Sequence, residues 1–284
     1  MRKRISDNNI FPVFSMETEY RKLQELFYDR DAFGKVIAIT QKVRPSLSYA
    51  DCIHSMFLDW NLRGTFTSVE EMMAALEISE DDFSDIITED RFLDYIQFLL
   101  NAIVFVDEQV KRGKYAIYRA GDTIINAIVD NCIHILNKLG AEIAEGKNEI
   151  FIAYKDDVAS AVAACSEDLS GSIVEYLKID NRGDLQRKGE ILCTFAKKLE
   201  PFEKIMNGSE FKALCTDTTT LMNNIGARHA LKPEDKLKAK FMNMDEGELE
   251  KWYDRAFHMF LGCMAVIPYL DIKSEIKAIK RDDL

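Results

Sequence analysis

The sequence has few of the residues that interrupt helices, with only five prolines and thirteen glycines in 284 residues. Between them, apolar residues recur at spacings of three and four, which is typical of helices with one buried face. No apolar run is long enough to cross a bilayer, and the charged start MRKRISDNN is not followed by the apolar segment of a signal peptide. These absences predict a mostly helical, cytoplasmic protein with no membrane partner.

Several catalytic and metal-binding signatures are also missing. There is no G-x-S-x-G turn for a serine nucleophile, no phosphate-binding loop and no dinucleotide fingerprint. The six cysteines lie far apart without a C-x-x-C pair, so we expect reduced thiols rather than disulfides or a zinc site. Cys52 with His54, and Cys132 with His134, are one residue apart, which points each pair to different sides of a helix. We expect no metal and no cofactor.

Positive charge is in the minority, with 37 Lys and Arg against 48 Asp and Glu and a formal net charge of -11. Duplex binding depends on basic side chains that displace counterions, so we expect no duplex DNA partner and only a local contact with RNA. Acidic residues gather between 80 and 90, near predicted helix starts, where the helix dipole favours negative charge. Glu145 and Lys147 have a nuclease-like E-x-K spacing, but they fall in a predicted turn.

Helical periodicity is clearest in a few segments. Apolar residues within 92–110 recur at spacings of three and four and predict one face of a long core helix. Residues 245–269 carry one broad apolar face. The predicted helix 122–139 is apolar around most of its circumference, so we expect it to lie at the centre of the fold. Ser68 and Asp245 each stand three residues before a glutamate, the capping spacing that predicts a helix start. Other helices are expected at residues 17–31, 156–178, 184–207 and 209–224.

One segment departs from helical spacing. AEIAEGKNEIFIAY, residues 141–154, alternates apolar and polar residues on either side of Gly146-Lys147-Asn148, as a β-hairpin does. The predicted fold is therefore all-α, a multi-helix bundle with one short β-hairpin at about 141–154. A soft boundary at the hairpin separates an N-terminal helical region, 1–140, from residues 141–284, and a single domain stays open.

The most polar predicted helix end is NNIGARHA, residues 223–230. Between 228 and 240, five basic residues against two acidic ones give a local charge of +3 in an acidic protein, so we predict an anion or RNA site here. The alternative is a structural helix end, because Asn and Gly226 tolerate the left-handed conformation of a C-cap. The candidate site comprises His229 and Arg228 for catalysis, and Asn223, Asn224, Lys232, Lys236, Lys238 and Lys240 for binding.

The same residues resemble a family motif. In the helical, HEPN-like C-terminal domains of bacterial abortive-infection proteins, a helix ends in R-N-x-x-G-x-x-H, and a loop and a long apolar helix follow. Asn223, Gly226 and His229 match that motif in register, and the resemblance covers about 184–270. A group of similar bacterial proteins has an NN…RH helix end followed by an LExWYD helix, as at residues 249–254 here.

The resemblance implies a role in defence against phages or mobile elements, through RNA binding or weak metal-independent RNA cleavage. In nuclease members of the family, two subunits bring paired Arg and His side chains together, so it also implies a homodimer. The family arginine falls on Met222, which leaves enzyme activity open. The rival hypothesis is a non-enzymatic helical protein–protein interaction module in which NNIGARHA is a structural helix end. A third is a small-molecule pocket beside the helix 122–139.

Overall fold

The computed structural model describes residues 14–28, 35–38, 49–77, 87–112, 115–118, 123–145, 149–225, 240–241 and 243–282. The chain divides into two compact units, Met1–Ile152 and Ala153–Leu284, which we call unit 1 and unit 2. The division falls inside the second strand of the predicted hairpin, whereas the sequence placed a soft boundary before it. Helices dominate both units, so the predicted all-α fold with a short β-hairpin is confirmed.

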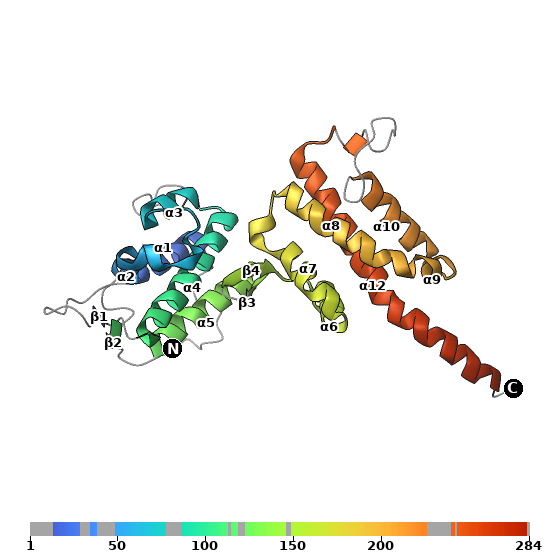
Figure 1. Ribbon diagram of the computed structural model, residues 1–284, viewed down its shortest axis with the longest axis horizontal. Helices are drawn as coiled ribbons and strands as arrows, with labels where there is room; N and C mark the ends of the chain where they lie inside the picture. The colour runs from blue at the N-terminus through green and yellow to red at the C-terminus, as the bar shows by residue number, and fades with distance from the viewer. Residues whose placement is uncertain are drawn as a thin grey trace, which may run out of the picture. The chain divides into compact units, whose positions relative to one another are not determined.

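Unit 1 is built around one long helix, α4 (Glu89–Lys111) (Figure 1). This helix buries side chains at neighbouring positions along 92–106, so its buried surface runs around most of the helix. The central helix is therefore α4 and not the predicted 122–139, because α5 leaves Ile133 41% exposed. The other helices and strands of the unit are α1 (Met16–Tyr28), β1 (Lys35–Ala38), α2 (Tyr49–Met56), α3 (Val69–Ala75), β2 (Tyr115–Tyr118), α5 (Thr123–Lys138) and β3 (Ala141–Glu145).

Side-chain amides of α4 hold the hairpin strand β4 (Ile150–Tyr154), which pairs with β3. The Asn101 Nδ2 donates to the Ile150 carbonyl at 2.6 Å, and the Ile150 N–H donates back to the Asn101 Oδ1 at 2.8 Å. The Ile152 N–H donates to the Gln97 Oε1 at 2.7 Å. Since a buried backbone group without a partner is costly, these amides replace part of a strand ladder.

A second two-stranded sheet was not predicted. Strands β1 and β2 pair antiparallel, with Lys35 opposite Tyr118 and Ala38 opposite Tyr115. Each strand has only four residues, and the described part of the chain between them includes α2, α3 and α4. Such short partners distant in sequence carry no local signal of the kind that a tight hairpin turn provides.

Several helices of unit 2 begin at aspartate caps. Asp156 Oδ1 accepts from the Ala159 N–H at 2.8 Å, and Asp245 Oδ1 accepts from the Glu248 N–H at 2.9 Å, so the predicted start at Asp245 is confirmed. The predicted helix 156–178 is broken at Ser166, whose extended backbone ends one helix and begins the next. The helices are α6 (Asp157–Cys165), α7 (Glu167–Leu177), α8 (Leu185–Leu199), α9 (Glu203–Asn207), α10 (Lys212–Asn224) and α12 (Glu246–Asp282).

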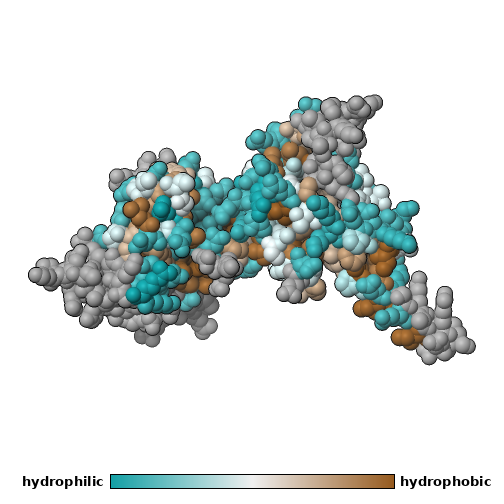
Figure 2. Space-filling view, viewed as in Figure 1, coloured by the Kyte–Doolittle hydropathy of each residue, from teal (hydrophilic) through white to brown (hydrophobic). Residues whose placement is uncertain are grey.

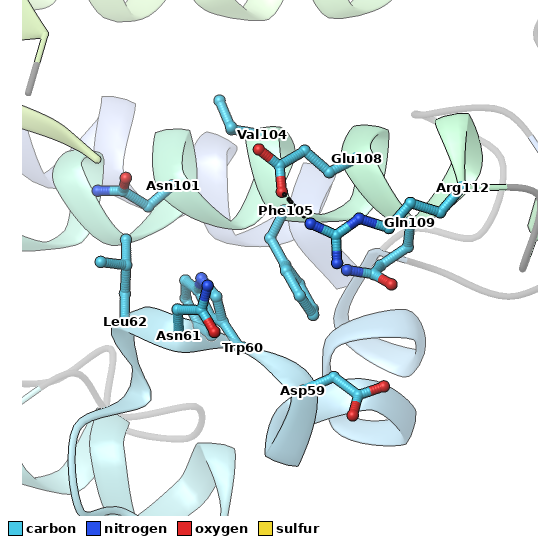
Figure 3. Close-up of a pocket in the computed structure, with 10 residues that line it drawn as sticks. All are labelled: Asp59, Trp60, Asn61, Leu62, Asn101, Val104, Phe105, Glu108, Gln109 and Arg112. Carbon is cyan, nitrogen blue, oxygen red and sulfur yellow. Dashed lines mark ion pairs between the residues drawn. The ribbon is translucent and has the colours of Figure 1, made fainter. Parts of the chain in front are cut away.

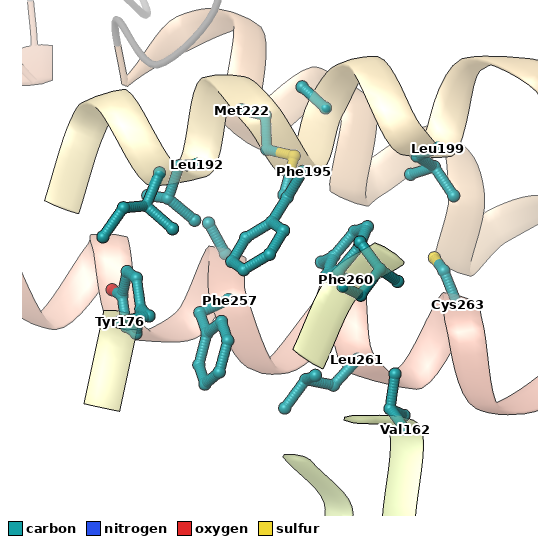
Figure 4. Close-up of a cluster of buried hydrophobic side chains, with 14 of the residues drawn as sticks. Val162, Tyr176, Leu192, Phe195, Leu199, Met222, Phe257, Phe260, Leu261 and Cys263 are labelled. Atoms are coloured by element: carbon teal, nitrogen blue, oxygen red, sulfur yellow. The ribbon is translucent and has the colours of Figure 1, made fainter. Parts of the chain in front are cut away.

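The core of unit 2 lies between α8 and α12 (Figure 4). The Phe195 ring stacks on Phe260 with centroids 4.6 Å apart, and the Tyr176 ring stacks on Phe257 at 4.2 Å. Burial of one such side chain stabilises a fold by about 1.5–3 kcal/mol, so these rings contribute much of the unit's stability. Phe257 and Phe260 lie on the apolar face that the sequence predicted for 245–269.

Helix α12 continues to Asp282, past Pro268 and past the predicted end at 269. Its residues Glu246–Lys273 are long and apolar enough to cross a membrane by length and composition, although the sequence analysis expected no such run. Phe257, Phe260 and Leu261 pack inside unit 2, and 39% of the apolar window of this helix is buried. Figure 2 shows hydrophobic residues also on the surface of the C-terminal part of α12.

Candidate functional site

The predicted site begins at the C-terminal end of α10. Asn223 and Asn224 are the last two residues of this helix, and Lys240 is exposed. Residues 226–239 lie outside the described part of the chain. The catalytic candidates Arg228 and His229, and the binding candidates Lys232, Lys236 and Lys238, fall in that range.

The described part of this helix end is packed into the core. Met222, at the position of the family arginine, is fully buried, and Ile225 is buried beside it. The Tyr253 hydroxyl of α12 donates to the Ile225 carbonyl at 3.3 Å, so it satisfies one of the carbonyls that a helix end leaves unpaired. Burial raises the pKa of Tyr253, which therefore remains a neutral donor.

Both asparagines at this helix end also bury a side-chain oxygen. The Asn224 Nδ2 donates to the Thr220 carbonyl at 2.6 Å, one turn back along α10. The Oδ1 atoms of Asn223 and Asn224 have no hydrogen-bond donor among the described residues. Two acceptors are thus gathered where α10 ends, directly before the basic segment 228–240.

A larger polar network lies on α12, where Glu250, Asp254 and His258 follow one another at intervals of four residues and share a helix face. The Lys188 ammonium of α8, only 7% exposed, lies 2.7 Å from the Glu250 Oε1 and 2.9 Å from the Asp254 Oδ1. The Tyr176 hydroxyl donates to the same Asp254 oxygen at 2.9 Å. Burial, and next the Asp254 carboxylate, raise the pKa of Tyr176.

The Glu250 carboxylate is held in its charged form. Burial alone would raise its pKa, but the Gly183 N–H, which donates to Oε1 at 2.8 Å, and the Lys188 ammonium outweigh that effect. The pKa of Glu250 is therefore lowered. Because Lys188 is enclosed by opposite charges and donates to both carboxylates, it is an ion-pair partner rather than a nucleophile.

His258 joins this network to the start of α6. Its Nε2 lies 3.0 Å from the Asp156 Oδ2, and its Nδ1 lies 2.7 Å from the Asp254 carbonyl. Both partners are acceptors, so a neutral ring donates to one of them, and which one depends on the tautomer. The contact is a tether between α6 and α12. The sequence prediction did not include His258 in a site, and the spacing of four residues from Asp254 was the available signal.

Unit 1 contains a small polar hollow between α4 and the short 3-10 turns Phe57–Asp59 and Asn61–Arg63 (Figure 3). Its volume of about 40 Å³ accommodates a few waters or one small polar group. Gln109 is 1% exposed, and its Oε1 has no donor among the described residues. No residue of α5 lines this hollow, so it is not the pocket that the sequence placed beside 122–139. The lining residues are Asp59, Trp60, Asn61, Leu62, Asn101, Val104, Phe105, Glu108, Gln109 and Arg112.

The buried thiols are poor candidates for nucleophiles or ligands. Burial raises the pKa of both Cys52 and Cys132 to about 12, and that of Cys263 to about 11. His54 and His134 are exposed while Cys52 and Cys132 are buried, so the members of each pair point to different sides. Within the described residues, no three His, Cys, Asp or Glu side chains form a group that could hold a metal ion.

Comparison with known proteins finds no matching family model, no matching curated protein and no matching solved structure.

Proposed function

We propose that this chain is a helical protein–protein interaction module in which the α10 end is structural. Met222 and Ile225 are buried there, and the Tyr253 hydroxyl binds the last carbonyl. These contacts account for the burial of the helix end without a ligand. In the polar network on α12, both ring nitrogens of His258 lie within hydrogen-bond distance of acceptor atoms of the chain itself.

The observation that carries the proposal is the exposed apolar stripe of α12. Tyr269, Ile272, Ile276 and Ile279 are 47, 52, 40 and 63% exposed. A continuous apolar surface on a helix is typical of an interaction site, whereas single exposed apolar residues are ordinary. The earlier turns of the same helix bury their apolar residues inside unit 2. The stripe therefore presents an apolar face that a partner helix could bind.

Photo-cross-linking in the cells that produce the protein tests this function. A photoreactive amino acid replaces Ile276 in one variant and Ile133 in a second, because these residues have nearly equal exposed fractions, 40 and 41%. We expect a discrete cross-linked species from position 276 and none from position 133. Equal yields at both positions, or no species from 276, would reject an interaction role for this face.

A second candidate function is RNA binding by the segment that begins at Asn223. Two observations favour it: the buried Oδ1 atoms of Asn223 and Asn224 lack donors among the described residues, and basic side chains follow directly. Because the family arginine is replaced by the buried Met222, we propose binding rather than cleavage. A role in defence of the HEPN-like, abortive-infection type belongs to this second candidate.

The RNA proposal is tested with single-stranded RNA and EDTA, with wild type compared against Arg228→Ala and His229→Ala. We expect retention of RNA by the wild type without cleavage, and weaker retention by Arg228→Ala, because a cation that contacts phosphate is lost. Cleavage that disappears in His229→Ala would instead support a nuclease. No retention by the wild type at low salt would reject both roles.

A further inference from the structure

The exposed stripe of α12 has the spacing of a coiled-coil seam. Tyr269, Ile272, Ile276 and Ile279 follow at intervals of three, four and three residues, the a and d positions of two successive heptads. A surface helix of a globular protein normally packs its apolar face against the core and exposes polar residues. Here each a and d position from 269 to 279 is apolar and exposed, so the pattern matches that of a helix whose partner is another helix.

Contacts within unit 2 reach the first of these heptads. The Tyr269 ring meets Phe211 edge to face with centroids 6.2 Å apart, and the Lys273 ammonium pairs with the Glu210 carboxylate. Beyond them, Ile276 and Ile279 remain exposed although the helix continues to Asp282. A helix that leaves its bundle loses the tertiary packing that normally stabilises it, so burial of this stripe would stabilise its last turns.

The charges beside the stripe identify the partner. In this register Glu275 occupies a g position and Lys280 occupies the next e position, and both are exposed. In a parallel pair of identical helices, Glu275 of each copy lies beside Lys280 of the other. In an antiparallel pair, g positions face g positions and e positions face e positions, so Glu275 would meet Glu275 and Lys280 would meet Lys280. Identical parallel helices are therefore complementary, and antiparallel ones repel.

We propose that α12 binds a second copy of this chain through residues 269–280, as a parallel coiled coil. This inference rests on the proposed interaction function and names its partner. Two heptads bury less surface than the roughly 1,600 Å² of a standard stable interface, so the association is reversible and depends on concentration. Isoleucine at a and d favours more than two strands, and the same g-to-e pairing serves any parallel assembly.

Sedimentation equilibrium of the full chain tests the seam. We expect the mean mass of the wild type to rise with concentration toward a multiple of the monomer. Ile276→Asp places a charge in the seam and should weaken the association constant at least tenfold. Ile133→Asp is the matched control, because Ile133 lies in unit 1 and has nearly the same exposed fraction as Ile276. Circular dichroism confirms that both variants fold; an equal effect of both, or no effect of Ile276→Asp, would overturn the proposal.

Charge reversal tests the parallel orientation. Glu275→Lys and Lys280→Glu should each weaken self-association, since either change puts like charges together across a parallel seam. The double variant should recover most of the wild-type association, because the pair is restored with its signs exchanged. If the single variants associate as the wild type does, the parallel register is wrong.

A wild-type chain that stays monomeric at every accessible concentration would overturn the second copy as partner. That result would not decide the wider interaction function, which rests on cross-linking at position 276. A cross-linked species there that contains a different protein would uphold the interaction function and reject self-association. The two proposals therefore fail separately.

Discussion

The longest helices of the two units carry polar side chains of different kinds. In unit 1, α4 presents neutral amides, Asn101 and Gln97, and their partners are backbone groups of β4. In unit 2, α12 presents the carboxylates of Glu250 and Asp254, and their partner is the Lys188 ammonium. Neutral amides keep their hydrogen bonds over a wide pH range, whereas ion pairs change with protonation. We therefore expect the units to respond differently to mutation and to acid.

The largest effect is expected in unit 1 from Asn101→Leu. The change removes the partner of both the N–H and the carbonyl of Ile150, and a buried group without a partner costs about 1–3 kcal/mol. We predict a loss of about 3 kcal/mol in the free energy of unfolding of unit 1. Hydrogen exchange at residues 150–152 measures it, because those amides should lose protection first.

Gln97→Met is the graded control for that prediction. It removes one side-chain bond to β4, from the Ile152 N–H, and should therefore cost about 1 kcal/mol. If the two variants destabilise unit 1 equally, the loss reflects altered packing of α4 and not the paired hydrogen bonds of Asn101.

Lys188→Met should destabilise unit 2 by about 2 kcal/mol. Removal of one partner from a buried ion pair costs about 3–5 kcal/mol, and we expect less here because the Asp254 side chain is 42% exposed and partly screened by solvent. Urea denaturation followed by hydrogen exchange in α8 and α12 measures the loss. Lys198→Met is the control, since its surface pair with Asp168 should contribute at most about 1 kcal/mol. Equal losses would mean that the burial of Lys188 adds nothing to the free energy of unfolding of unit 2.

Acid should weaken unit 2 through Glu250. Its pKa is lowered in the folded chain, so the folded state binds the proton less tightly than the unfolded state does. The stabilisation is complete above the ordinary glutamate pKa and is lost as the pH falls through the lowered value. Thermal unfolding from about pH 6 to about pH 3 should show a smaller loss in Glu250→Gln than in the wild type. Parallel curves for the two proteins would contradict this linkage.

Sequence spacing was sufficient where contacts are local. The long helix at 92–110, the hairpin, and the caps at Ser68 and Asp245 all depend on residues within a few positions of each other, and the structure confirms them. The break at Ser166 was missed because the apolar spacing continues on both sides, while only its backbone changes.

The polar sites depend on contacts that spacing does not contain. Lys188 lies 66 residues before Asp254 in the chain, and the Tyr253 hydroxyl binds a carbonyl 28 residues away. The interval of four among Glu250, Asp254 and His258 was visible, but nothing local showed which side chain would pair with them. Even for the NNIGARHA segment, the burial of Met222 follows from helices that pack against it and not from its neighbours in sequence.

The smallest expected effect is a change in thiol reactivity, and it compares the stabilities of the two units most directly. Cys132 in unit 1 and Cys263 in unit 2 are buried with raised pKa values, so each reacts with a thiol reagent only when its surroundings open. Exposed Cys165 should react at once in every variant and serves as the internal standard. We predict that Asn101→Leu speeds the labelling of Cys132 and that Lys188→Met speeds that of Cys263, as read by mass spectrometry of the peptides. If either variant speeds both thiols equally, the units open together, and the contrast between amides and ion pairs does not extend to separate stabilities.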